Sequence, residues 1–295
     1  CFATGSAEFF AMGAVALLDS LGCIDSICFG SECGDSKTLG KIARILAEEP
    51  GDYKSILQDA LRKGVSFPQA RQTALTQYFD MPSTDPDRIS SVNAKTVAAI
   101  LSQPNNILGI EYMKALYKRN SSMKAYSIKR IGAGYHESEL TESYSSASAI
   151  RRALIQDSLS ESIYRQLPSA AQNIMKEAFG TRYPVYANDF SPLLKYNLLQ
   201  ETKETLTNYM DISEDLANRI INLRNDFQSF DGFCDALKTK DMTYARISRG
   251  LLHILLDIRT EHLTYYKKNG YCHYTHILGF RKSSAELLSL LKGTS

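Results

Sequence analysis

Two short apolar segments that end in polar turns limit the fold of this chain more than any other feature. The first, residues 24–29, runs into Gly30, and the second, residues 123–130, ends in the cations Lys129 and Arg130. Both are too short for a core helix, and helical periodicity of apolar residues surrounds each of them. Alternating helices and strands predict an α/β layer with a mainly parallel sheet.

These are the only two convincing strands, and the chain opens without methionine directly in a predicted helix, at about residues 6–22. A parallel sheet of two strands leaves faces and edges uncovered. We therefore expect that an N-terminal segment with further strands is missing from this chain.

Beyond about residue 193 the apolar pattern becomes helical throughout. The predicted helices cover residues 194–209, 213–224, 229–238, 242–268 and 283–292. Residues 183–192 contain two prolines and are the expected linker. We thus divide the chain into an α/β domain, residues 1–182, and a helical domain, residues 183–295.

Charge is unevenly distributed, although the net charge is only +2. Residues 1–60 carry four basic and nine acidic side chains, whereas residues 238–295 carry ten basic and four acidic ones. A basic end suggests a polyanionic partner, and an ordinary solvated surface is the alternative. The apolar runs are too short to span a bilayer, so no membrane partner is expected. Six cysteines without CxxC spacing favour reduced thiols in a cytoplasmic protein.

Four residues are expected to gather at one rim of the α/β layer, and we call them the rim residues: Gly30, Asn105, Asn106 and Arg130. Asn105 is a good N-cap for the helix that begins near Asn106, and Gly109 would allow that helix to approach a neighbouring strand closely. Unpaired N–H groups and the helix dipole attract anions at such a start, and a cation at a strand end neutralises phosphate. Alternatively, Asn105 only caps its helix and Arg130 only pairs with a surface carboxylate.

A second candidate, here called the serine motif, consists of Ser145, Ser146 and Arg151. Serines at a helix start supply hydroxyl and amide donors, and an arginine about one turn later can reach the same anion. Capping alone is the alternative. His136, after the glycine turn at residues 132–134, is more often a surface residue than a base, and His253 in an apolar helix is expected in the core. We expect no metal site, and no Walker-type motif is present.

Cations surround Tyr244 in the helical half, and we call them the basic cluster: Lys238, Lys240, Arg246 and Arg249. Cations interleaved with an aromatic ring are typical of surfaces that bind RNA backbones and unstacked bases. A solvated helix face is the alternative reading.

Taken together, these segments resemble the bacterial tRNA(Met) cytidine acetate ligase family, which is nucleotidyltransferase-like. The matching segments are residues 29–32, 104–112, 128–136, 145–152, 238–247 and 277–280. The resemblance covers essentially the whole chain, and it implies a Rossmann-like nucleotidyltransferase domain followed by a mostly helical, tRNA-binding domain.

The resemblance also implies the chemistry. ATP, with Mg as its counter-ion, and acetate would form acetyl-adenylate and pyrophosphate. The amine of the wobble cytidine in elongator tRNA(Met) would then take the acetyl group, giving N4-acetylcytidine and AMP. By motif position, the rim residues would contact ATP, with one of the two asparagines involved. The serine motif resembles a second phosphate-handling motif, and the basic cluster would bind tRNA.

One family feature is absent. Members begin with a strand that leads to a His-x-x-His-type phosphate motif; this chain does not begin in that way, so no catalytic residue is assigned. We expect this chain to be inactive alone, although its parent should be a ligase. Two alternatives stay open: a non-catalytic RNA-binding module, and an adenylyltransferase acting on a small metabolite. The sequence assigns no oligomeric state.

Overall fold

The computed structural model describes residues 4–82, 92–131, 140, 145–157, 159–240 and 242–291. The predicted glycine turn and His136 lie outside these residues. Within them, no helix combines the length and the apolar character that crossing a bilayer requires.

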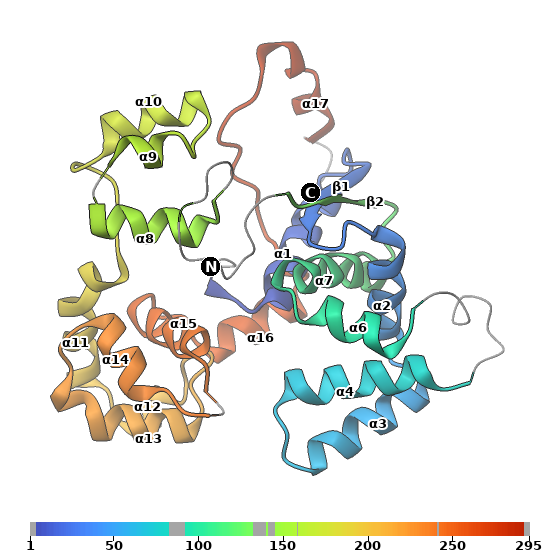
Figure 1. Cartoon of the computed structure of the whole chain (residues 1–295), viewed down its shortest axis with the longest axis horizontal. Coiled ribbons are helices and arrows are strands. Elements are labelled where there is room, and N and C mark those ends of the chain that lie inside the picture. Colours follow the sequence, from blue (N-terminus) through green and yellow to red (C-terminus); the bar gives the residue numbers. More distant parts are fainter. Residues whose placement is uncertain are drawn as a thin grey trace.

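A parallel pair of strands confirms the predicted α/β layer (Figure 1). Strand β1 (Ser26–Ser31) and strand β2 (Lys124–Lys129) pair in a register that sets Gly30 opposite Ile128. Strand β1 begins two residues later than the sequence predicts, and β2 lies within the predicted segment. Helix α1 (Ala7–Ser20) precedes the strands.

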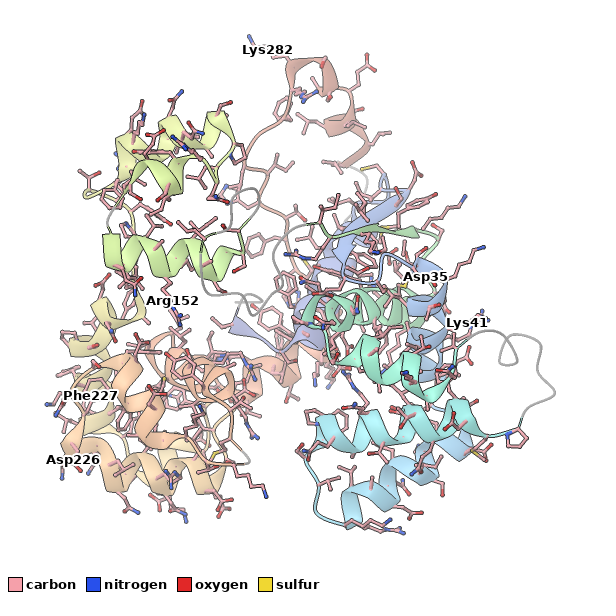
Figure 2. The ribbon with its side chains drawn as sticks, in the orientation of Figure 1. Asp35, Lys41, Arg152, Asp226, Phe227 and Lys282 are labelled. Carbon is pink, nitrogen blue, oxygen red and sulfur yellow. The ribbon has the colours of Figure 1, made fainter. Side chains whose placement is uncertain are left out.

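Among the described residues, five helices lie between the two strands. They are α2 (Ser36–Glu48), α3 (Gly51–Arg62), α4 (Phe67–Asp80), α6 (Ala94–Leu101) and α7 (Pro104–Arg119). Asp35 caps α2 by accepting hydrogen bonds from the N–H groups of Lys37 and Thr38 (Figure 2). Capping by an acidic residue satisfies two of the free amides at the helix start.

Helix α7 is the centre of this unit, because it packs against α1, α2 and β1. A Cβ atom on Gly109 would lie only 2.5 Å from Cε2 of Phe29, so glycine allows the helix to approach the strand closely, as predicted. The inner sheet face buries Phe29 and Ala125 against the helices. The outer face exposes Tyr126 and Ile128, at 53% and 65%.

A buried ionic network joins α1, α4 and α7. The carboxylate of Glu111, which is 3% exposed, lies 2.6 Å from Nη1 of Arg71 and 2.9 Å from Nζ of Lys114. Lys114 also reaches Glu8 of α1 at 2.8 Å. Burial opposes the charge on Lys114, but the two carboxylates outweigh burial and raise its pKa.

Helices α8 (Ala147–Asp157), α9 (Glu161–Tyr164) and α10 (Ser169–Ala178) form a third small group with its own apolar cluster around Leu154 and Ile163 (Figure 1). This group lies within the predicted first domain, and its core is separate from those of α1–α7. The predicted boundary between the two domains, at residue 183, lies shortly after α10 and stays a prediction.

The remaining elements lie between residues 187 and 291, and those between residues 187 and 255 form one core. The elements are η2 (Ala187–Phe190), α11 (Ser191–Gln200), α12 (Lys203–Leu206), α13 (Glu214–Leu223), η3 (Arg224–Asp226), α14 (Phe230–Leu237), α15 (Tyr244–Leu255), α16 (Thr260–Lys268), η4 (Lys282–Ser284) and α17 (Leu287–Leu291).

The predicted single helix over residues 242–268 is wrong. It is two helices, α15 and α16, because Asp257 takes a left-handed conformation with φ of 49° and reverses the chain. Arg259 then pairs with Asp257 at 2.8 Å and forms an isolated antiparallel bridge with Tyr209. His253 is buried, as expected, and its ring nitrogens lie 2.8 Å from the carbonyl oxygens of Met210 and Thr4.

Candidate functional site

The turn after β1 packs against the end of β2 and is joined to it by hydrogen bonds. Ser31 is fully buried; its Oγ atom lies 2.6 Å from Oγ of Ser127 and accepts a hydrogen bond from the N–H of Gly34. Gly34 has φ of +67°, and a Cβ atom there would lie 2.6 Å from Cβ of Lys129. Glycine satisfies both the left-handed backbone and this close approach, so the turn has a fixed position relative to β2.

Gly30 and Arg130 lie side by side at this end of the strands. The N–H of Arg130 donates to the carbonyl oxygen of Ser31 at 2.9 Å. A Cβ atom on Gly30 would lie 3.3 Å from Cγ of Arg130, so the missing side chain lets the arginine stem cross the strand. Both residues are exposed, and Arg130 has no ion pair with any residue that the structure describes. The structure therefore gives no support to the alternative that Arg130 only pairs with a surface carboxylate.

The start of α7 differs from the prediction. The helix begins at Pro104, so Asn105 lies in its first turn, and the N-cap residue is Gln103. The free amides are occupied by Glu32: its carboxylate accepts from the N–H of Asn106 at 2.8 Å and from Nδ2 of Asn105 at 2.7 Å. Partial burial opposes ionisation of Glu32, but the bonds from Asn105 and Asn106 outweigh it and lower the pKa of the carboxyl group.

Asn106 has a structural role. It is 2% exposed; Oδ1 accepts from the N–H of Cys33 at 3.1 Å, and Nδ2 donates to the carbonyl oxygen of Ile100 at 3.2 Å. Asn106 therefore ties the turn after β1 to the end of α6. The side-chain oxygen of Asn105 makes no hydrogen bond with the described residues, so it is available to a ligand.

The rim residues thus converge where the sequence predicts, at the carboxyl ends of β1 and β2. Ligands of open α/β sheets bind at this edge. Their roles divide: Gly30 and Arg130 form an open surface, Asn105 borders it, and Asn106 supports it from behind. Glu32, to which the sequence assigns no individual role, holds the two asparagines in place.

The serine motif lies elsewhere, at the start of α8 in the third group: Ser145 and Ser146 precede the helix, and Arg151 lies on it (Figure 1). Ser146 is buried, and its Oγ accepts from the N–H of Ala149 at 3.0 Å, as a helix cap does. The N–H of Ser145 donates to Oε1 of Gln166 at 3.0 Å, while Arg151 is exposed. The contacts described for this motif are within its own group, which matches the capping alternative.

The four residues of the basic cluster also differ in their surroundings. Lys238 and Lys240 are exposed at the end of α14, and Arg246 is partly exposed on α15. Arg249 is held by Asp211, at 3.0 Å between Nε and Oδ2, with both side chains less than a third exposed. Arg249 therefore stabilises the helical unit internally.

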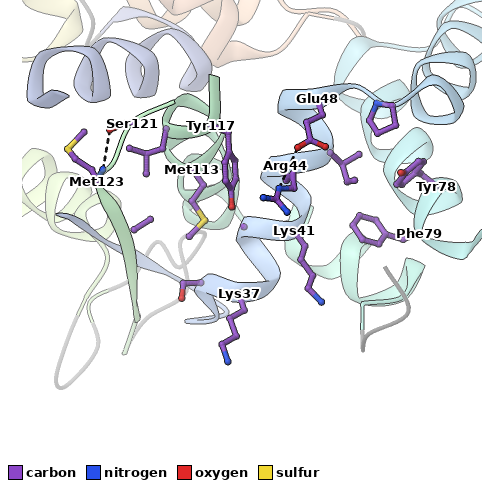
Figure 3. Close-up of a pocket in the computed structure, with 16 residues that line it drawn as sticks. Lys37, Lys41, Arg44, Glu48, Tyr78, Phe79, Met113, Tyr117, Ser121 and Met123 are labelled. Carbon is purple, nitrogen blue, oxygen red and sulfur yellow. Dashed lines mark hydrogen bonds and ion pairs between the residues drawn. The ribbon is translucent and has the colours of Figure 1, made fainter. Parts of the chain in front are cut away.

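A groove that the sequence did not predict lies between α2, α4 and α7 and encloses about 610 Å³. Lys37, Lys41 and Arg44 line it, and their spacing places them on one face of α2. Figure 3 shows Arg44 turned towards Tyr117, with the guanidinium carbon 5.6 Å from the ring centroid. In the sequence, the spacing of the three cations predicts their shared helix face but not the groove. In the described part of the chain, no group of three or more histidine, cysteine or carboxylate side chains could hold a metal ion.

Comparison with known proteins gives a consistent family signal. The family model described as HIGH nucleotidyl transferase matches residues 1–295. A tRNA(Met) cytidine acetate ligase of Acetivibrio thermocellus is 37% identical over 297 residues, which cover 99% of this chain and 69% of the relative. The enzyme of that name from Clostridium perfringens is also 37% identical, covering 100% and 70%.

Solved structures agree with the sequence relatives. The apo form I structure of Thermotoga maritima TmcAL superposes with a TM-score of 0.89 at 31% identity, over 98% of this chain and 66% of that one. The structure of the same protein bound with alpha-thio ATP gives 0.87, over 100% and 66%. The chain spans about two thirds of the length of the proteins it matches.

Proposed function

Because this chain belongs to the HIGH nucleotidyl transferase family and, within it, to the tRNA(Met) cytidine acetate ligases, we propose that it forms N4-acetylcytidine at the wobble position of elongator tRNA(Met). The observation that carries the proposal is similarity along the whole chain rather than at one motif. The relative bound with alpha-thio ATP supports the use of ATP. We place the reaction in the cytoplasm.

The proposed reaction has two steps. An oxygen of the acetate carboxylate attacks the α-phosphorus of ATP, and the bond to the β-phosphate oxygen breaks, which gives acetyl-adenylate and pyrophosphate. The exocyclic amine of the wobble cytidine then attacks the acyl carbon, loses a proton and expels AMP. Negative charge shifts along the phosphates in the first step, so positioned cations, including Mg²⁺, would contribute most of the catalysis.

At the rim, Arg130 is the proposed phosphate ligand, because the stem of its exposed side chain lies across Gly30 at the strand ends. Gly30 would let the nucleotide approach the backbone, and the side-chain oxygen of Asn105 would accept a hydrogen bond from it. Asn106 would act through the turn that it holds. The serine motif stays a predicted second phosphate contact, which requires α8 to approach the rim.

On the helical unit, the exposed members of the basic cluster are the proposed tRNA contacts: Lys238, Lys240 and Arg246. Arg249 would support this surface through its ion pair with Asp211. Phosphate contacts of this kind make affinity fall steeply with salt, by about one logarithmic unit of slope per neutralised phosphate.

The test combines two assays on the 295-residue chain. Acetate-dependent exchange of labelled pyrophosphate into ATP reports the first step, and mass spectrometry of a tRNA(Met) transcript reports acetylation of its wobble cytidine. The Arg130→Ala variant should lose exchange activity, whereas Lys124→Ala, at the opposite end of the same strand, should retain it.

Each outcome has a clear meaning. The relatives give no support to the expected inactivity of this chain, and absence of exchange together with absence of acetylation would contradict the proposal. Retained tRNA binding under those conditions would favour the RNA-binding module. Equal exchange by Arg130→Ala and the unchanged chain would remove Arg130 from the nucleotide site.

A further inference from the structure

A stretch of 24 residues after the basic cluster has an unusual composition. From residue 262 to residue 285 the chain contains no aspartate or glutamate. The same stretch contains Lys267, Lys268, Arg281 and Lys282, together with five tyrosine or phenylalanine residues. Positive charge next to aromatic rings, without carboxylates, favours a polyanion that also presents flat rings.

The backbone of this stretch reverses sharply at the end of α16. Gly270 and Tyr271 both take left-handed conformations, with φ of 84° and 72°. The N–H of Tyr271 donates to the carbonyl oxygen of Tyr266 at 2.7 Å, which closes the turn. The ring of Tyr271 packs against Phe9 of α1, with centroids 5.7 Å apart, so the reversal is anchored to the α/β layer.

The reversal brings His273 back against the last turns of α16. Its ring centroid lies 5.4 Å from those of both Tyr265 and Tyr266, and these two rings meet edge to face at 6.0 Å. Tyr265 is 58% exposed, and the following Tyr274 is 82% exposed. We call Tyr265, Tyr266, His273 and Tyr274 the ring cluster. The first three rings pack on one another, and Tyr274, the residue after His273, adds an exposed ring that can stack on a base.

The neighbouring cations form no ion pair with a described residue, although Lys267 interacts electrostatically with Glu8 of α1. Lys267 and Lys268 lie in the last turn of α16, directly after the two tyrosines of the ring cluster. Neither forms an ion pair with a described carboxylate, and both are exposed. Lys282 extends into solvent at the far end of the stretch (Figure 2). Most of this positive charge is therefore available to a polyanion outside the chain.

We propose that the ring cluster, with Lys267 and Lys268, binds the unpaired bases of an RNA loop, and that it holds the anticodon loop of the tRNA substrate. This inference rests on the proposed function for the identity of the RNA. Rings stack only on bases that are free of a double helix, whereas lysines neutralise any phosphate backbone. Single-stranded RNA uses both features, and a duplex uses only the lysines.

The decisive experiment measures fluorescence anisotropy of two labelled RNAs with the whole chain. One is the anticodon stem-loop of tRNA(Met), and the other has the same stem closed into a full duplex. Tyr274→Ala should weaken binding of the stem-loop by about fivefold or more, the usual loss of one stacked base, and leave the duplex unchanged. Tyr274→Phe keeps the ring and should bind as the unchanged chain does. Tyr196→Ala is the matched control, since Tyr196 is 65% exposed on α11.

Several results would overturn the inference. Equal affinity of the unchanged chain for the two RNAs would show binding by charge alone, and no RNA binding at all would remove the surface. Normal affinity of Tyr274→Ala for the stem-loop would show that the ring of Tyr274 does not contact the RNA, and would favour a protein as the partner of the ring cluster.

The acetylation assay separates this inference from the proposed function. Loop binding that depends on Tyr274, without any acetylation, would support the RNA surface and contradict the ligase assignment. Acetylation by Tyr274→Ala with an unchanged KM for tRNA would support the ligase assignment and contradict the RNA surface.

Discussion

The carboxylate of Glu32 joins the end of β1 to the first turn of α7, and its removal tests how the rim is held. Glu32→Ala deletes two short hydrogen bonds to an ionised group, at 2.7 and 2.8 Å, and a third at 3.3 Å. Bonds to charged groups contribute about 1.5–3 kcal/mol each when buried, and loss of a helix cap costs about 0.5–2 kcal/mol. Because Glu32 is only partly buried, we expect a loss of about 2 kcal/mol at neutral pH.

The pH dependence gives this prediction its specificity. The pKa of Glu32 is lower in the folded protein than the ordinary value of 4.5, so its contribution is complete above that ordinary value. The contribution disappears as the pH falls through the lowered folded pKa. The difference in unfolding free energy between the unchanged chain and Glu32→Ala should therefore shrink in acid, while other carboxylates titrate equally in both proteins.

Urea unfolding followed by circular dichroism, at neutral and at acid pH, measures this difference. Amide hydrogen exchange in the first turn of α7 should also accelerate in Glu32→Ala. Glu48→Ala is the control, because its pair with Arg44, at 3.5 Å, is exposed on both sides and is worth less than about 1 kcal/mol. A loss for Glu32→Ala that is equal at both pH values, or no larger than the control, would refute the reasoning.

Three further substitutions test the packing around α7 and the strand ends. Glu111→Gln leaves Arg71 without its carboxylate partner in a buried network, and we expect a loss of about 3 kcal/mol, measured by urea unfolding. Gly109→Ala places a methyl group 2.5 Å from Phe29, which should lower stability by about 1–3 kcal/mol in the same assay. Gly34→Ala combines positive φ with a close contact, and thermal unfolding should show a loss of about 1–2 kcal/mol.

Each of these substitutions has a neutral counterpart. Gly51→Ala adds a methyl group that meets no atom within 4 Å, so it should leave stability unchanged or slightly higher. Arg62→Ala breaks an exposed pair with Asp59 and should cost less than about 1 kcal/mol. Losses in these controls as large as those above would mean that the close contacts are not the cause.

Local sequence patterns predicted most helices and strands of this fold well. The reason is that the buried face of a helix or strand repeats over neighbouring residues of the sequence. Both strands were placed within two residues, and the close approach at Gly109 was anticipated. The start of α7 was misplaced because Pro104, whose φ already suits a first helical position, begins the helix ahead of the asparagines.

The partners of the site residues were less predictable, because they are distant in sequence. Glu32 reaches Asn105 across 73 positions, and Asp211 reaches Arg249 across 38. A polar residue in a turn and an arginine on a helix have the same local pattern whether they face solvent or each other. Only the three-dimensional fold decides that Arg130 lacks a described ion pair and Arg249 has one.

The two halves of the proposed reaction are linked through α1. His253 of the helical unit lies 2.8 Å from the carbonyl oxygen of Thr4, just before α1, and Tyr271 packs on Phe9 within it. Helix α1 packs along α7, whose first turn is fixed to the rim by Glu32. The ring cluster and the rim are thus connected by packed helices rather than by a loose linker. In the proposed reaction, an acyl-adenylate is lost to water unless the attacking amine is already in position, so this packed connection would favour acetyl transfer over hydrolysis.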